Sequence, residues 1–235
     1  MGLLIGAVGI GGVLLIPALI VLGGLGPHAA SATALATFLF TGLLGTWLFQ
    51  RRGSIDWGRT AVVCVAAVLF SAIGAVVAQA VSAVVLTRVI ALCIVFAGSY
   101  VFLPIRPAAA PSSRGPAHER ALLAFIGAAA GFGSGLSGAG GPLFSVPLMM
   151  IFGFPPLMAI GTSQALQVIS AGAGTAANLH FGAVDFASAL WVTGFELAGV
   201  LAGAKIAHVA SPAQLRKGAA VLCLVVGAAM LLRTL

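Results

Sequence analysis

Long apolar stretches separated by short polar breaks fill almost the whole chain. A helix needs about 20 apolar residues to cross ~30 Å of hydrocarbon. Six stretches have roughly that length, and they cover residues 29–50, 59–80, 83–104, 157–179, 187–208 and 211–233. This pattern predicts an all-α fold, a polytopic membrane helix bundle.

Two further apolar segments are irregular. Residues 1–22 are rich in glycine and contain Pro17, and residues 120–153 are too long for one span and have Gly and Pro in their middle. Both predict interrupted or re-entrant helices. The stretch Arg106–Glu119 is rich in Pro, Ser and charge, which is typical of a linker. We therefore expect an N-terminal repeat over 1–105, a linker over 106–119 and a C-terminal repeat over 120–235.

Composition excludes a water-soluble domain. Of the 235 residues 61% are hydrophobic and 6% charged, whereas soluble domains average about 25% charged residues. The net charge of +7 comes from Lys and Arg in the polar breaks, with no basic patch and interleaved aromatics that would indicate nucleic-acid binding. Cys64, Cys93 and Cys223 lie inside apolar runs without CxxC spacing, so we expect packed thiols and no metal or cofactor. The N-terminus lacks the basic segment of a cleavable signal peptide.

The two halves of the sequence match at a constant offset of 129 residues. Gly9–Gly12 (GIGG) aligns with Gly138–Gly141 (GAGG), Thr33 with Thr162, and Gly53–Trp57 with Gly182–Phe186. These matches indicate an internal duplication. Asp56 and Asp185 each precede a span, where a helix cap is the simplest role and gating the alternative. Met1 aligns with Ala130, so residues 120–129 have no counterpart in the first half.

The distribution of Lys and Arg favours an inverted duplication. If residues 120–153 leave and re-enter on the same side, nine basic residues lie on one side of the membrane and two on the other, as the positive-inside rule predicts. We expect each half to have about three full spans plus one interrupted helix. The linker and most basic loops are then cytoplasmic, in a multi-pass protein of the cell inner membrane. The nine are Arg51, Arg52, Arg59, Arg106, Arg114, Arg120, Lys205, Arg216 and Lys217, against Arg88 and Arg233.

The glycine-rich breaks are the first candidate site. Inverted repeats with interrupted helices are typical of transporters, and a break exposes peptide N–H groups at a positive helix end. Gly140 and Gly141 precede Pro142, which suits the first position of a helix, and Gly11 and Gly12 are their counterparts. The alternative is that these glycines only allow close helix packing.

Polar side chains inside spans give a second set of candidates. Thr162, Ser163, Gln164 and Asn178 need hydrogen-bond partners within the bilayer, from protein or ligand. Glu196 is the only acid well inside a span. An intramembrane carboxylate suggests proton coupling, and a protonated structural side chain is the alternative.

These motifs together resemble the TauE/SafE family of sulfite exporters. The resemblance is carried by the doubled GxGG…Pro element, by the run Ala159–Ser163 and by the G-x-[IV]-D-aromatic loops. It implies export of a small anion such as sulfite, sulfoacetate or a related organosulfur anion. It also implies pocket positions at Gly11, Gly12, Thr33, Gly140, Gly141 and Thr162.

Three alternatives remain open at this point. A passive anion channel would need the same anion site but no proton. The sequence Gly135–Gly138 (GLSG) matches the nucleophile pattern of rhomboid proteases, with His180 as a conceivable partner for Ser137. A Ser–His dyad requires hydrogen-bond contact, so a non-enzyme is the main expectation. The GxxxG pair Gly199–Gly203 is compatible with a homodimer face or with packing inside one bundle.

Overall fold

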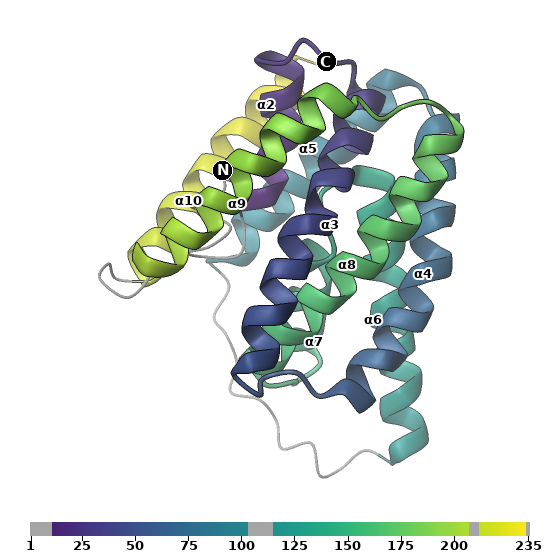
Figure 1. Cartoon of the computed structure of the whole chain (residues 1–235), viewed down its shortest axis with the longest axis vertical. Helices are drawn as coiled ribbons and strands as arrows, with labels where there is room; N and C mark the ends of the chain where they lie inside the picture. Colours follow the sequence, from purple (N-terminus) through teal and green to yellow (C-terminus); the bar gives the residue numbers. More distant parts are fainter. Residues whose placement is uncertain (1–10, 103–114, 207–211, 234–235) are drawn as a thin grey trace.

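Every regular element of the described part of the chain is a helix. The computed structural model describes residues 11–102, 115–206 and 212–233, and its helices form one bundle (Figure 1). A 3-10 turn, η1, spans Gly11–Leu14. The helices are α2 (Leu15–Val21), α3 (Pro27–Arg51), α4 (Trp57–Ala80), α5 (Ala83–Tyr100), α6 (Pro116–Ser137), α7 (Pro142–Ile151), α8 (Pro156–His180), α9 (Phe186–Ile206) and α10 (Pro212–Leu232).

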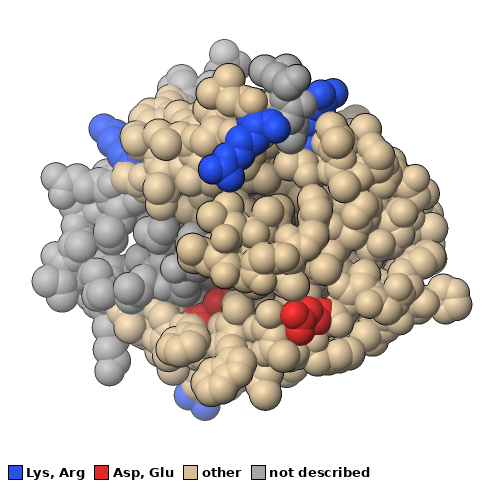
Figure 2. Space-filling view, turned by 90° about the horizontal axis from the view of Figure 1, so that it is seen from above, with Lys and Arg blue, Asp and Glu red and all other residues tan. Residues whose placement is uncertain are grey.

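The six predicted spans are confirmed as helices α3, α4, α5, α8, α9 and α10. Within the described residues, α3, α4, α5 and α6 are long and apolar enough to cross a membrane. Large apolar side chains stand on the outside of the bundle, as Trp191 and Phe195 of α9 do at 72% and 74% exposure. Such a surface suits lipid rather than water. Figure 2 views the bundle from above and shows few Lys, Arg, Asp or Glu side chains on a surface made mostly of uncharged residues.

The predicted interruption of 120–153 is confirmed. α6 ends at Ser137, α7 begins at Pro142, and the four residues between them are buried. α6 already begins at Pro116, inside the stretch predicted as a linker, because Pro116 occupies the first helical position and Glu119 the favourable first turn. Of the other irregular segment, the described part is η1 followed by α2, which contains Pro17 in its first turn.

Helix starts follow the expected capping chemistry. The Asp56 side chain accepts a hydrogen bond from the Arg59 N–H at 3.2 Å, and Asp185 accepts from Ala187 and Ser188 at 3.0 and 3.3 Å. Both predicted aspartate caps are therefore confirmed.

The two ends of the bundle are marked by the turns of the chain. The turns at residues 52–56 and 152–155 lie at one end, called the lower end here, and the turns at residues 22–26 and 181–185 lie at the other, called the upper end (Figure 1).

The second half of the bundle is inverted relative to the first. α3, α4 and α5 run opposite to their counterparts α8, α9 and α10 (Figure 1). α3 and α8 cross at the axis that relates the halves. There the Gln167 amide donates a 3.1 Å hydrogen bond to the Phe38 carbonyl, and these residues are repeat counterparts, since 167 − 38 = 129.

A second contact repeats this two-fold relation between α5 and α10. Gly98 packs against Leu224, and Gly227 packs against Val95. Because 227 − 98 = 129 and 224 − 95 = 129, each contact is the other one with the halves exchanged. Reciprocal contacts of this kind define a two-fold axis, and the predicted inverted duplication is confirmed.

α4 and α6 pack closely along a line of glycines. Gly127, Gly131 and Gly135 of α6 lie against the backbone of Val63, Ala67 and Ser71 of α4. At Gly131, a Cβ atom would lie 2.7 Å from the Ala67 carbonyl oxygen. Small residues every four positions let two backbones approach in this way. α8 lies inside the bundle against α3, α4, α6 and α7.

Candidate functional site

The α6–α7 break lies inside the bundle and is shaped by glycine. Gly138 ends α6 in the left-handed conformation, with φ of +70°, and Gly140 has φ of +84°. L-residues with a Cβ avoid this region, whereas glycine enters it freely. The Ser137 hydroxyl accepts a hydrogen bond from the Ala139 N–H at 3.2 Å and donates to the Gly133 carbonyl at 2.6 Å. The break is therefore an ordered turn.

The start of α7 leaves peptide N–H groups unused. The Phe144 and Ser145 N–H groups and the Ser145 hydroxyl all donate to the Gly141 carbonyl, and Pro142 has no N–H. Among the described residues, no acceptor takes a hydrogen bond from the N–H groups of Gly140, Gly141 or Leu143. Unpaired donors at a helix start carry partial positive charge and attract anions.

Side chains of α3 and α8 cover this start of α7. Gly140 faces Phe38, whose ring would lie 3.3 Å from a Cβ atom at that position. Gly141 faces Leu166 and the Ser170 hydroxyl, which would lie 3.3 Å from a Cβ atom there. A Cβ at Gly141 would overlap the Leu166 side chain, so glycine at this position lets the start of α7 pack directly against α8.

Beside the break, three fully buried serines come together from three helices. The Ser71 hydroxyl of α4 donates to the Ser170 carbonyl at 2.6 Å, and the Ser134 hydroxyl of α6 lies 3.4 Å from the Ser170 hydroxyl of α8. Sequence reasoning missed this cluster, because an isolated serine in an apolar run has no distinguishing pattern. The one signal in the sequence was that Ser134 precedes the glycine break by about one helical turn.

The predicted polar residues of α8 lie along its whole length. Thr162 contacts Thr60 of α4 at 2.9 Å near the lower end, and the Ser163 hydroxyl donates to the Ile160 carbonyl of its own helix. Gln164 covers Gly45 of α3. Near the upper end, Asn178 accepts a 3.0 Å hydrogen bond from Gln79 of α4.

The first-half counterparts are not brought to the break in the same way. Thr33 accepts a 3.0 Å hydrogen bond from the Asp185 N–H at the upper end, so Thr33 and Thr162 lie at opposite ends of the bundle. Gly11 and Gly12 begin η1. Val13 and Leu14 of η1 share one apolar core with Phe38 and Ala139 of the break.

Glu196 is a buried carboxyl in the middle of α9. Its exposure is 2%, and neither of its oxygens has a hydrogen-bond partner among the described residues. It lies beside Thr37 of α3, and Thr37 donates to the Ala34 carbonyl at 2.8 Å. The next residue along α3, Phe38, covers Gly140. The carboxyl and the break therefore lie against neighbouring positions of one helix.

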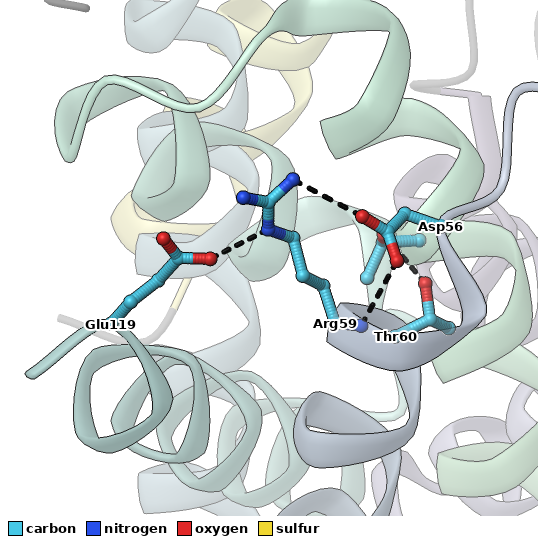
Figure 3. Close-up of polar contacts among 5 residues, drawn as sticks. Asp56, Arg59, Thr60 and Glu119 are labelled. Atoms are coloured by element: carbon cyan, nitrogen blue, oxygen red, sulfur yellow. Dashed lines mark hydrogen bonds and ion pairs between the residues drawn. The ribbon is translucent and has the colours of Figure 1, made fainter. Parts of the chain in front are cut away.

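An ion-pair cluster closes the lower end between α4 and α6 (Figure 3). The Arg59 guanidinium donates to Glu119 at 2.6 Å and to Asp56 at 3.1 Å. Next to it, Thr60 makes its contact with Thr162 of α8. Sequence reasoning used Arg59 only as an indicator of membrane topology. It missed that Glu119, in the first turn of α6, forms an ion pair with Arg59 of α4.

The described residues do not form a Ser–His dyad. The Ser137 hydroxyl is engaged with Gly133 and Ala139 at the break, whereas the His180 ring stacks edge-on against Phe181 at the end of α8. Among the residues that the structure describes, no group of three or more His, Cys, Asp or Glu side chains could hold a metal ion.

Comparison with known families decides the assignment. The family model described as "Sulfite exporter TauE/SafE" matches residues 1–230 of the chain. The chain belongs to the TauE/SafE sulfite exporter family. No curated protein and no solved structure matches it. As a TauE/SafE protein with this apolar exterior, it is embedded in a membrane.

Proposed function

We propose that this TauE/SafE protein is a secondary transporter that exports a small anion, such as sulfite, sulfoacetate or a related organosulfur anion, by alternating access with proton coupling. The observation that carries the proposal is the buried α6–α7 break with its unused peptide N–H groups. The break supplies an anion site inside a bundle whose described interior holds no Lys or Arg side chain.

The anion binds at the start of α7 in this proposal. The N–H groups of Gly140, Gly141 and Leu143 donate to its oxygens, and the helix end supplies partial positive charge. The Ser170 hydroxyl, which donates to the Leu166 carbonyl of its own helix in this structure, turns in this proposal to add a donor from α8. Backbone donors suit an oxyanion that must leave again, because they bind it without the strong ion pair that a buried Arg would form.

The polar residues of α8 belong to the route on either side of this site. Thr162, Ser163 and Gln164 lie on the lower part of α8 and Asn178 on the upper part, where their amide and hydroxyl groups replace part of the anion's hydration. Gly11, Gly12 and Thr33 stay as the proposed contributions of the first half, as the family resemblance implies.

Glu196 carries the coupled proton in this proposal. A carboxylate buried in apolar surroundings is strongly disfavoured, so the proposal assigns a protonated Glu196 to this state of the protein. Thr37 of α3 lies beside the carboxyl.

The lower end faces the cytoplasm in our proposal. Arg51, Arg52, Arg59 and Arg120 lie at the ends of helices that meet there, and basic residues are enriched on the cytoplasmic side of inner-membrane proteins.

The proposal is tested by anion flux in proteoliposomes with and without a pH gradient. Sulfite, sulfoacetate, other small sulfonates and carboxylates form the panel. Gly140→Leu should abolish flux, whereas Gly194→Leu should not, because the Cβ position of Gly194 has no neighbour within 4 Å. If Gly140→Leu transports anions at the wild-type rate, the glycines of the break serve only helix packing and the proposed anion site is wrong.

The same assay separates transporter from channel. Glu196→Gln should remove the response to the pH gradient, and collapse of the gradient should slow the wild type. Flux that continues unchanged after both perturbations would indicate a passive channel.

A further inference from the structure

The last turns of α3 combine exposed aromatic and basic side chains at the lower end of the bundle. The Arg51 guanidinium lies over the Trp47 ring, with its Cζ atom 4.0 Å from the ring centre. Trp57, the first residue of α4, donates a 2.5 Å hydrogen bond from its indole N–H to the Gln50 side chain. Arg52 follows directly and is exposed, as Arg51 is. Two tryptophans therefore order a corner of the bundle that carries two exposed arginines.

An apolar stripe leads from the middle of the bundle to this corner. Phe40, Leu43 and Trp47 lie three and four residues apart, so they share one face of α3, and each is 49% or 50% exposed. From Phe40 to Arg51 there are 11 residue steps, or about 16 Å at a rise of ~1.5 Å per residue. This length is about half of the ~30 Å hydrocarbon thickness, so the stripe spans one leaflet of a bilayer.

The acidic side chains of the protein are engaged away from this corner. The chain contains four of them. Asp56 and Glu119 both pair with Arg59 (Figure 3), Asp185 caps α9 at the upper end, and Glu196 is buried in α9. The positive charge of the corner is therefore left for a negative group from outside the chain.

The equivalent corner at the upper end has different chemistry. Both corners turn at a glycine with φ of +63°, Gly53 below and Gly182 above. At the offset of 129 residues, the counterparts of the stacked tryptophan and the two arginines are Ala176, His180 and Phe181. Because the same turn forms there without tryptophan or arginine, these residues are not required to end the helix. Their place in the lower corner needs another reason.

We infer that the lower corner binds an anionic phospholipid, such as phosphatidylglycerol, from the adjacent leaflet. Arg51 and Arg52 hold its phosphate, and an acyl chain lies along the stripe of Phe40, Leu43 and Trp47. Stacking occupies the face of the Arg51 guanidinium and leaves the N–H donors at its edge for phosphate oxygens. A free phosphate would use the arginines but not the stripe, which is why a lipid fits the corner better. The inference does not depend on the transported solute.

Native mass spectrometry of the purified protein tests the inference. The affinity of the first bound lipid is measured for phosphatidylglycerol and for phosphatidylcholine with the same acyl chains. Arg51→Gln and Arg52→Gln each remove one phosphate ligand, and Trp47→Leu removes the stacking partner. The matched controls are Arg233→Gln, at an exposed arginine beyond α10, and Trp191→Leu, at a tryptophan of α9 that is 72% exposed.

We expect the wild type to prefer phosphatidylglycerol and each arginine variant of the corner to bind it about tenfold more weakly, as for loss of one charge-assisted hydrogen bond. Trp47→Leu should weaken it about twofold to fivefold, which is the effect of an exposed cation–π contact. Both controls should keep the wild-type affinity. All five side chains are exposed, so the variants should remain folded, and size-exclusion chromatography checks this.

Equal affinity of the wild type for the two lipids would overturn the inference, and so would equal losses in Arg51→Gln and Arg233→Gln. Glycerol phosphate, added in large excess, separates a lipid site from a site for free phosphate. It should leave the bound lipid in place, because it has no acyl chain to lie along α3. Displacement of the lipid by glycerol phosphate would show that the corner recognises a soluble phosphate, and the assignment of a lipid would be wrong.

Discussion

Replacing Gly140 by alanine tests whether the left-handed turn at the break matters. With φ of +84°, an alanine at this position carries a backbone penalty of about 1–2 kcal/mol. Its Cβ would also lie 3.3 Å from the Phe38 ring, so the ring must shift slightly. We expect a loss of about 1–2 kcal/mol in folding free energy, which corresponds to a decrease of roughly 2–8 °C in Tm for a chain of this size.

The matched control is Gly194→Ala on α9. Gly194 is helical and has open space at its Cβ position, and alanine is favoured over glycine by up to about 1 kcal/mol inside a helix. Thermal unfolding of the two purified variants in detergent, followed by intrinsic fluorescence, gives both Tm values. Equal Tm values for the two variants would refute the reasoning that the break depends on a positive φ at Gly140.

Three further substitutions probe the rest of the bundle. Arg59→Gln removes the ion pairs at the lower end; because these groups are partly exposed, we expect a loss of about 0.2–1 kcal/mol per pair, and high salt should reduce the difference from wild type. Gly131→Val places a branched side chain on the α4 backbone, so size-exclusion chromatography should show aggregated protein, whereas Gly218→Val, which has open space, should remain monodisperse. Ser137→Ala removes the acceptor of the Ala139 N–H, so we expect about 1–3 kcal/mol lower folding stability. Serine-reactive phosphonates should label neither the wild type nor this variant. Labelling of the wild type alone would revive the protease alternative.

The length of the apolar runs and the internal repeat predicted the fold well, because membrane helices must be long and apolar. The six spans, the break in 120–153 and the inverted repeat followed from run length, glycine position and charge. The start of α6 was misplaced, because a linker and the first turn of a helix share the same residue types around Pro116. The end of α5 at Tyr100 was also set too late, since apolar residues continue beyond it.

The candidate site was less accessible to sequence reasoning, because its residues come from several helices that lie far apart in the sequence. The glycines of the break were visible as a motif. The serine cluster of Ser71, Ser134 and Ser170 was not, because only the crossing of α4, α6 and α8 brings these residues together. Conversely, Thr33 and Thr162 look equivalent in the sequence, yet inversion of the repeat sends them to opposite ends of the bundle.

The hydrogen bond between Gln167 and Phe38 has an evolutionary consequence. In an ancestor of half this length, two identical chains inserted in opposite orientations would have met at this position, each presenting the same side chain to its twin. A phenylalanine facing a glutamine across this crossing was impossible while both copies came from one gene. The difference between Phe38 and Gln167 therefore arose after duplication, and a homodimeric relative with one residue type at this crossing would preserve the earlier arrangement.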